Sequence, residues 1–172
     1  TRKYRLGNGF LRLARIREAT VPVRQAAQEV ADWLIEQVGE TVHVSLPGPT
    51  GMTTIAYRLP ARGHIITIDP AEVLPYHATA SGLAVLSFAD PPARQRLLGL
   101  PRAAMTSQTV TDPAALLPLA EAFSTQGYSE THSTFEEDVA SLAMPFFQGG
   151  TKPAGCIAIA LPAGDMTPDR KE

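Results

Sequence analysis

One stretch near the middle of the chain constrains the fold most. Residues 76–86 read Tyr-His-Ala-Thr-Ala-Ser-Gly-Leu-Ala-Val-Leu, a run of small residues that leads into an apolar helix. A hydroxyl of Thr79 or Ser81 can cap that helix, because it can accept a hydrogen bond from a free N–H of the first turn. Ala80, Ser81 and Gly82 leave space above these donors, and an uncovered helix N-terminus can hold an anion. The stretch is therefore either the floor of a ligand site or a point of close packing between a helix and a sheet.

Six segments have the alternating or continuously apolar pattern of β-strands. They are 41–46, 53–59, 64–68, 128–132, 138–147 and 153–161. The first alternates clearly, with Val42 and Val44 on one side and His43 and Ser45 on the other. A tight turn at 60–63 joins the second segment to the third, which predicts an antiparallel meander.

Helices are expected before and between these strands. The segments with helical spacing or helix-capping residues are 10–18, 20–38, 79–89, 91–99 and 113–126. Asp90-Pro91 and Asp112-Pro113 repeat a cap-plus-proline start, and Gly127 is a typical helix end. Strands near both ends with helices between them predict an α+β domain, in which helices pack against one antiparallel sheet.

Composition narrows the class of protein further. A length of 172 residues suits one domain with a substantial core, and a net charge of −2 does not suit nucleic-acid binding by the domain as a whole. No apolar run approaches the roughly 20 residues that cross a bilayer, and the start lacks a signal-peptide pattern. The single cysteine, Cys156, excludes an internal disulfide and a Cys-rich metal site. We expect a cytoplasmic protein, and, because residue 1 is Thr, a fragment of a longer chain.

The first 17 residues are basic. They contain six of the 15 Lys and Arg residues, all before the first acidic residue, Glu18. Such an arm can contact phosphates, but no recognition motif accompanies it, which favours a solvated linker helix. We therefore divide the chain into an entry helix at 1–19 and a single domain at 20–172.

The sequence contains no recognisable catalytic or metal-binding motif. Ser81 and Gly82 lack the Gly-x-Ser-x-Gly context of a hydrolase nucleophile, and Cys156 lies in an apolar strand. The histidines lack metal-ligand spacing, and phosphate-binding glycine loops are absent, so we expect neither metal nor cofactor. The acidic run 136–138 could hold a cation, although a solvated loop is the simpler interpretation. A binding module is favoured, with a hydrolase that uses Ser81 or Cys156 with His77 as the alternative.

Residues 76–86 resemble the His-Ala-x-Ala-x-Gly-Lys-Ala-x-Leu signature of IclR-type transcription regulators. Three further segments agree with that family in order and spacing: Tyr4–Gly7, Gly127-Tyr128 with 138–145, and 157–162. The resemblance covers nearly the whole chain. It implies a GAF- or profilin-like effector-binding domain that forms a homodimer or tetramer and binds a small molecule. It also implies operator binding through an N-terminal helix-turn-helix absent from this chain, and a C-terminal helix that is cut short.

The resemblance also implies a ligand site. Carried over by position, its ligand-binding residues are Ala80, Ser81, Gly82, Thr131, Ser141, Ala158 and Ala160. Leu83 stands where the family has Lys, and Ala158 and Ala160 stand where it has serines. These departures predict a wide, apolar site for an aromatic or apolar effector, with a polar tip held at Ser81 or Ser141.

Overall fold

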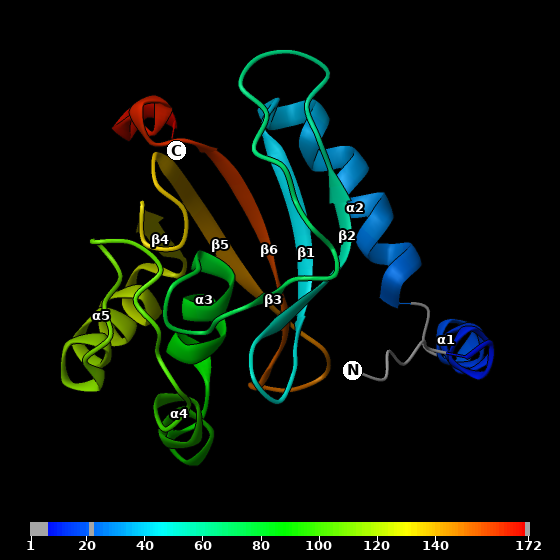
Figure 1. The fold of residues 1–172 in the computed structure, drawn as a ribbon, viewed down its shortest axis with the longest axis horizontal. Helices are drawn as coiled ribbons and strands as arrows, with labels where there is room; N and C mark the ends of the chain where they lie inside the picture. Colours follow the sequence, from blue (N-terminus) through cyan, green and yellow to red (C-terminus); the bar gives the residue numbers. More distant parts are fainter. Residues whose placement is uncertain (1–6, 21–22, 171–172) are drawn as a thin grey trace, which may run out of the picture.

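The computed structural model describes residues 7–20 and 23–170. Two expectations concern residues outside these ranges: the first three residues of the Tyr4–Gly7 motif with the basic residues beside them, and the end of the chain. Within the described residues, six antiparallel strands form one sheet in the order β3-β2-β1-β6-β5-β4 (Figure 1). The strands are β1 (Thr41–Pro47), β2 (Met52–Arg58), β3 (Val73–Leu74), β4 (Ser129–His132), β5 (Val139–Phe147) and β6 (Pro153–Pro162).

Five of the six expected strands lie where the sequence placed them, and one expectation was wrong. Residues 64–68 are not a strand. The third strand is instead the two-residue β3, whose Val73 and Leu74 pair with Thr53 and Met52 of β2. The long segment between β2 and β3, residues 59–72, is called the β2–β3 connection below. It crosses the face of the sheet, and the Thr41 hydroxyl holds it by donating to the carbonyl oxygen of Ile66 at 2.7 Å.

Helices cover both faces of the sheet. They are α1 (Gly9–Thr20), α2 (Val23–Val38), α3 (Ala80–Phe88), α4 (Pro91–Leu98) and α5 (Pro113–Gln126), followed after β6 by two short 3₁₀ turns at Ala163–Asp165 and Pro168–Arg170. On one face α2 packs against β1 and β2. On the other, α3 packs against β4, β5 and β6, and α5 packs against α3 (Figure 1). The predicted α+β fold is confirmed.

Helix α3 is the centre of the molecule. Residues 80–87 are all buried, as expected for a helix that is apolar or small on every side. Its N-cap is Thr79, whose hydroxyl oxygen accepts from the Gly82 N–H at 3.0 Å. At the other end, the Arg94 guanidinium donates to the carbonyl oxygens of Leu86 and Ser87 at 3.2 and 2.7 Å. Both ends of a buried helix are thus hydrogen-bonded within the protein, which keeps α3 stable without solvent.

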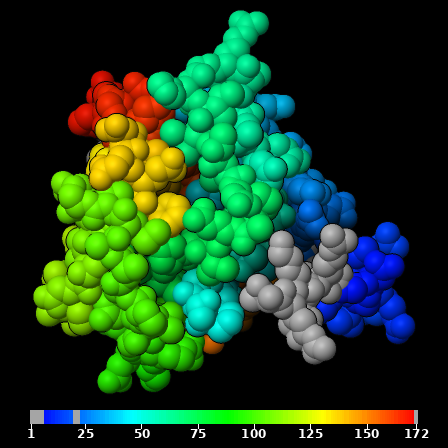
Figure 2. All heavy atoms as spheres, viewed as in Figure 1, coloured from blue at the N-terminus to red at the C-terminus, as the bar shows by residue number. Residues whose placement is uncertain are grey.

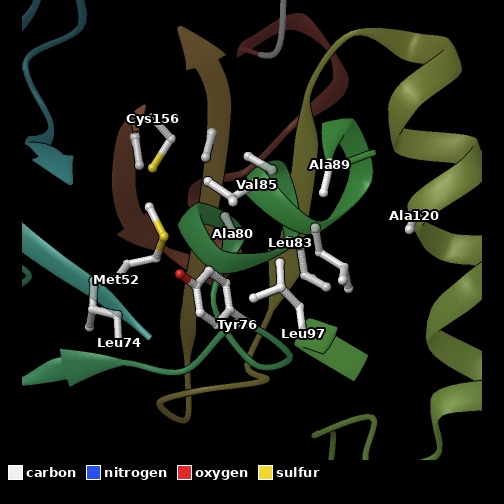
Figure 3. Close-up of a cluster of buried hydrophobic side chains, with 14 of the residues drawn as sticks. Met52, Leu74, Tyr76, Ala80, Leu83, Val85, Ala89, Leu97, Ala120 and Cys156 are labelled. Atoms are coloured by element: carbon white, nitrogen blue, oxygen red, sulfur yellow. The ribbon is translucent and has the colours of Figure 1, made fainter. Parts of the chain in front are cut away.

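The sheet separates two hydrophobic cores. The larger core lies between α3, α4, α5 and the sheet, and includes Leu83, Leu97 and Cys156 (Figure 3). The smaller core lies under α2, where Ala27 and Ala31 contact Val42 and Val44 of β1. Strand β1 therefore contributes alternate residues to opposite sides.

Helix α1 differs from the others because the side chains of residues 9–19 are all exposed. Phe10, Leu11 and Leu13 are 58%, 63% and 63% exposed. Exposed apolar side chains grouped in this way are typical of surfaces that bind another molecule. Among the described helices, none has the length and hydropathy needed to span a bilayer.

Candidate ligand-binding site

The register of the sheet brings three of the predicted site residues into one row. Thr131 of β4 pairs with Ser141 of β5, and Ser141 pairs with Ala160 of β6. Ala160 in turn pairs with Thr41 of β1. Paired residues of antiparallel strands point to the same face, so these side chains form a line across the sheet beside the start of α3.

A cavity of about 80 Å³ lies over this row. Its walls come from the first residues of α3, from the β2–β3 connection at 66–69 and 72, and from positions 135 and 136 of the β4–β5 segment, residues 133–138. Figure 2 shows the β2–β3 connection in teal-green beside the yellow β4–β5 segment on this face of the molecule. The cavity therefore lies between the sheet and two exposed segments of irregular structure.

Five of the seven predicted ligand-binding residues line the cavity: Ala80, Ser81, Thr131, Ser141 and Ala160. Gly82 does not, because it packs against the chain that precedes the helix. A Cβ at Gly82 would lie 2.4 Å from the Cα of Tyr76 and 2.6 Å from the carbonyl oxygen of Pro75. Residues 76–86 are thus both a cavity wall, at Ala80 and Ser81, and a point of close packing, at Gly82.

Ala158 also lies outside the cavity lining. It sits one row along the sheet, paired with His43 of β1 and Ala143 of β5, and is only 1% exposed in the larger core. The small side chain at 158 lies directly beside the His43 imidazole. At about 80 Å³ the cavity is small rather than wide as predicted, and the buried His43 side chain is one of those that line it.

His43 is the site residue that the sequence reasoning missed. It lines the cavity, is 5% exposed, and its Nε2 lies 2.9 Å from the Ser81 hydroxyl oxygen. Its Nδ1 is buried without a hydrogen-bond partner among the described residues. Burial lowers the pKa of His43 to about 4, so the ring is neutral near pH 7. The alternation of Thr41, His43 and Ser45 was the signal that could have found it.

The predicted hydrolase pair does not form. The His77 Nε2 lies 2.9 Å from the carbonyl oxygen of Ala103, and the imidazole beside Ser81 is that of His43. A histidine with a pKa near 4 is a weak general base for a serine. Burial raises the pKa of Cys156 to about 12 despite hydrogen bonds from Ser81 and the Ser45 backbone, so its thiol stays protonated. These residues form a buried polar cluster rather than an activated nucleophile.

The charged side chains around the cavity are acidic. Asp69 and Glu72 belong to the β2–β3 connection and Glu136 to the β4–β5 segment, and all three are exposed. Among the described residues that line this cavity, none is Lys or Arg. Within residues 7–20 and 23–170, no three His, Cys, Asp or Glu side chains are grouped so that they could hold a metal ion, and these carboxylates are no exception.

A larger hollow of about 770 Å³ lies elsewhere, between α1, the start of α2 and β2. One of its walls consists of Ala14, Arg17 and Glu18 of the exposed helix α1. This hollow is an open groove with no concentration of buried polar groups. The smaller cavity, with its convergent Ser81 and His43, has the features expected of a ligand site.

Comparison with known proteins gives a consistent result. Residues 18–172 match a family described as "Bacterial transcriptional regulator IclR C-terminal". A candidate IclR transcriptional regulator from Silicibacter sp. TM1040 has a similar crystal structure, with a TM-score of 0.91 and 39% identity over 99% of this chain and 68% of that one. An IclR homolog from Microbacterium hydrocarbonoxydans, solved in complex with 4-hydroxybenzoate, shares the fold with a TM-score of 0.83 and 23% identity over 96% of this chain and 69% of that one.

A glycerol operon regulatory protein of Streptomyces coelicolor is 27% identical over 157 residues. The match includes 91% of this chain, which spans 61% of the length of that relative. The family match covers most of the chain, and the fold agrees with solved members of the same family. The chain belongs to the IclR family of transcriptional regulators and comprises its C-terminal, effector-binding domain.

Proposed function

We propose that this domain senses a small aromatic or apolar metabolite for a DNA-binding transcription regulator, and that the metabolite binds in the cavity at the N-terminus of α3. The observation that carries the proposal is the convergence of Ser81, Thr131 and Ser141 with a buried, incompletely hydrogen-bonded His43 on one cavity. The Microbacterium homolog, which was solved with 4-hydroxybenzoate, supports an aromatic ligand for this fold.

The cavity offers both polar and apolar surface. The first-turn N–H groups of Ala80 and Ser81 precede the one capped by Thr79, and a helix leaves such donors free for a polar ligand group. Ile66, Ile68 and Phe135 supply apolar walls. The residues that would contact the ligand are Ala80, Ser81, Thr131, Ser141 and Ala160. Gly82 and Ala158 would pack behind these residues without contacting the ligand.

Binding requires the cavity to enlarge. Pockets for drug-sized ligands are typically about 300–1,000 Å³, against about 80 Å³ here. The β2–β3 connection is the wall that would move, because most of it is exposed and irregular and such segments open at low cost. An effector that binds the enlarged arrangement better shifts the population toward it, and that shift is the regulatory signal.

The remainder of the protein completes the proposed mechanism. Residues 1–19 form the linker from an N-terminal DNA-binding domain, and residues 20–172 form the sensor. The regulator is a cytoplasmic homodimer or tetramer that contacts its operator outside this domain. The exposed Phe10, Leu11 and Leu13 support association through α1. The domain has no catalytic role, in keeping with the weak base beside Ser81.

A thermal-shift screen over substituted phenols and aromatic acids tests the function. We expect at least one compound to raise Tm, and Ser141→Leu to abolish the shift by filling the cavity. Ser124→Leu, the same change at an exposed site on α5, is the control and should retain it. No shift with any compound would contradict the proposal. Hydrolysis of an ester or amide that disappears in Ser81→Ala would favour an enzyme instead.

A further inference from the structure

We propose that this cavity selects an uncharged, hydroxyl-bearing effector over a carboxylate, and that His43 is the side chain that hydrogen-bonds the effector. The inference rests on the proposed function, because it concerns the ligand class of the same cavity. It depends on two independent observations, the unpartnered nitrogen of His43 and the charge of the cavity wall.

The first observation is the hydrogen bonding of His43. Its side chain lines the cavity and is nine-tenths buried, with Nε2 beside Ser81 and Nδ1 lacking a partner in the described chain. Buried polar atoms are nearly always hydrogen-bonded. Nδ1 is closed off in the present arrangement, although its side chain lines the cavity, so the partner it lacks would reach it as the cavity enlarges around a ligand.

The chemistry of that group follows from the state of the ring. Burial keeps the imidazole neutral, so one nitrogen donates and the other accepts. The Ser81 hydroxyl can complement either tautomer at Nε2. A ligand hydroxyl can likewise donate to Nδ1 or accept from it, whereas a carboxylate can only accept. A hydroxyl therefore fits both states of the His43–Ser81 pair.

The second observation concerns charge. Asp69, Glu72 and Glu136 place three carboxylates on the cavity wall, and the described lining offers no cationic side chain to offset them. The positive end of α3 attracts anions only through a partial charge. A carboxylate ligand would leave water for a site whose lining carboxylates repel it. A neutral ring or chain would lose no such hydration and would contact Ile66, Ile68 and Phe135.

A matched ligand pair tests this selection. Benzyl alcohol and benzoate share a ring and differ in one group, which is a neutral hydroxymethyl group in the first and a carboxylate in the second. In titration calorimetry at low salt, we expect the alcohol to bind at least tenfold more tightly. The triple change Asp69→Asn, Glu72→Gln and Glu136→Gln should reduce that ratio several-fold, as should added salt. The control Glu36→Gln, Glu121→Gln and Asp165→Asn makes the same net-charge change at exposed sites outside the cavity lining, and should leave the ratio unchanged.

Replacement of His43 provides the second arm. His43→Gln should weaken binding of the alcohol at least tenfold while changing benzoate binding less. The exposed acidic variants keep the test decisive if the His43 variant fails to fold. Tighter binding of benzoate, or a ratio unaffected by the acidic variants, would overturn this inference and leave the sensor function standing. Binding of neither compound would also overturn it, and the wider screen would then decide the sensor function separately.

Discussion

At the scale of single residues, Gly82 is fixed by its neighbours rather than by its own backbone angles. Its missing Cβ would lie 2.4 Å from the Tyr76 Cα, and backbone atoms at that distance cannot move aside cheaply. We expect Gly82→Ala to destabilise the domain by about 3 kcal/mol or to prevent folding, since overpacking a tight core contact costs this much. Urea unfolding measures the loss.

Gly150 is the matched control for that substitution. It lies in the loop between β5 and β6, and a Cβ there would meet no atom within 4 Å. Gly150→Ala should change the free energy of unfolding by less than about 0.5 kcal/mol. Equal effects at the two glycines would contradict the packing role of Gly82.

His43 predicts a specific acid sensitivity. Its pKa is near 6.5 in an unfolded chain and about 4 in the folded protein, so the unfolded state binds the proton more readily. The stabilisation is complete above about pH 6.5 and is lost as the pH falls toward 4, by roughly 3 kcal/mol in total. Urea unfolding at pH 7 and pH 4.5 should show this loss in the wild type and a smaller one in His43→Gln. The same loss in both proteins would place the acid sensitivity elsewhere.

The roles of single residues were predictable where they depend on neighbours in the sequence. They were not predictable where they depend on which strands pair in the sheet. The small residues at the start of α3, and a cap by Thr79 or Ser81, could be inferred from the chain itself. The contact between His43 and Ser81 joins residues 38 positions apart. It requires knowing that β1 pairs with β6, which puts His43 opposite Ala158. A single sequence does not state which strands are neighbours.

At the scale of elements, α3 depends on its N-cap. The Thr79 hydroxyl accepts from the Gly82 N–H and donates to the carbonyl oxygen of Pro75 at 2.9 Å. Thr79→Ala should destabilise the domain by about 1 kcal/mol, the usual cost of losing such a cap. Thr79→Ser keeps both hydrogen bonds and should cost little. Thermal unfolding compares the variants, and an equal loss in both would refute the capping role.

Strands and helices were predicted well where burial and periodicity agree. Cap-plus-proline pairs marked the starts of α4 and α5, both confirmed by the side-chain caps of Asp90 and Asp112. Residues 64–68 failed because β-branched, half-buried residues also suit a segment that lies over a sheet. Ile66 and Ile68 are partly buried against the cavity rather than in the ladder. Strand propensity reflects a preference for a half-buried surface. A strand within the sheet and an irregular segment lying over the sheet both provide such a surface, so propensity alone does not distinguish them here.

At the scale of the whole molecule, α1 predicts self-association. Phe10, Leu11 and Leu13 are each more than half exposed, although burial of such side chains is favourable by about 1.5–3 kcal/mol each. Changing all three to Gln should lower the molar mass in solution toward that of the monomer, as measured by light scattering after size-exclusion chromatography. Arg12→Gln with Arg15→Gln is the control on the same helix. An unchanged mass in the apolar triple variant would assign the interface to another surface.

Strand β1 has one further consequence. His43 faces the cavity, while Val42 and Val44 on either side of it contact α2 through the other core. A strand rises only about 3.3 Å per residue and has no slack between neighbours. A backbone displacement at His43 thus also displaces Val42 and Val44, against which α2 packs, and α2 is the helix that follows α1 in the chain. A ligand that shifts the backbone of β1 would therefore also shift the surface on which α2 rests.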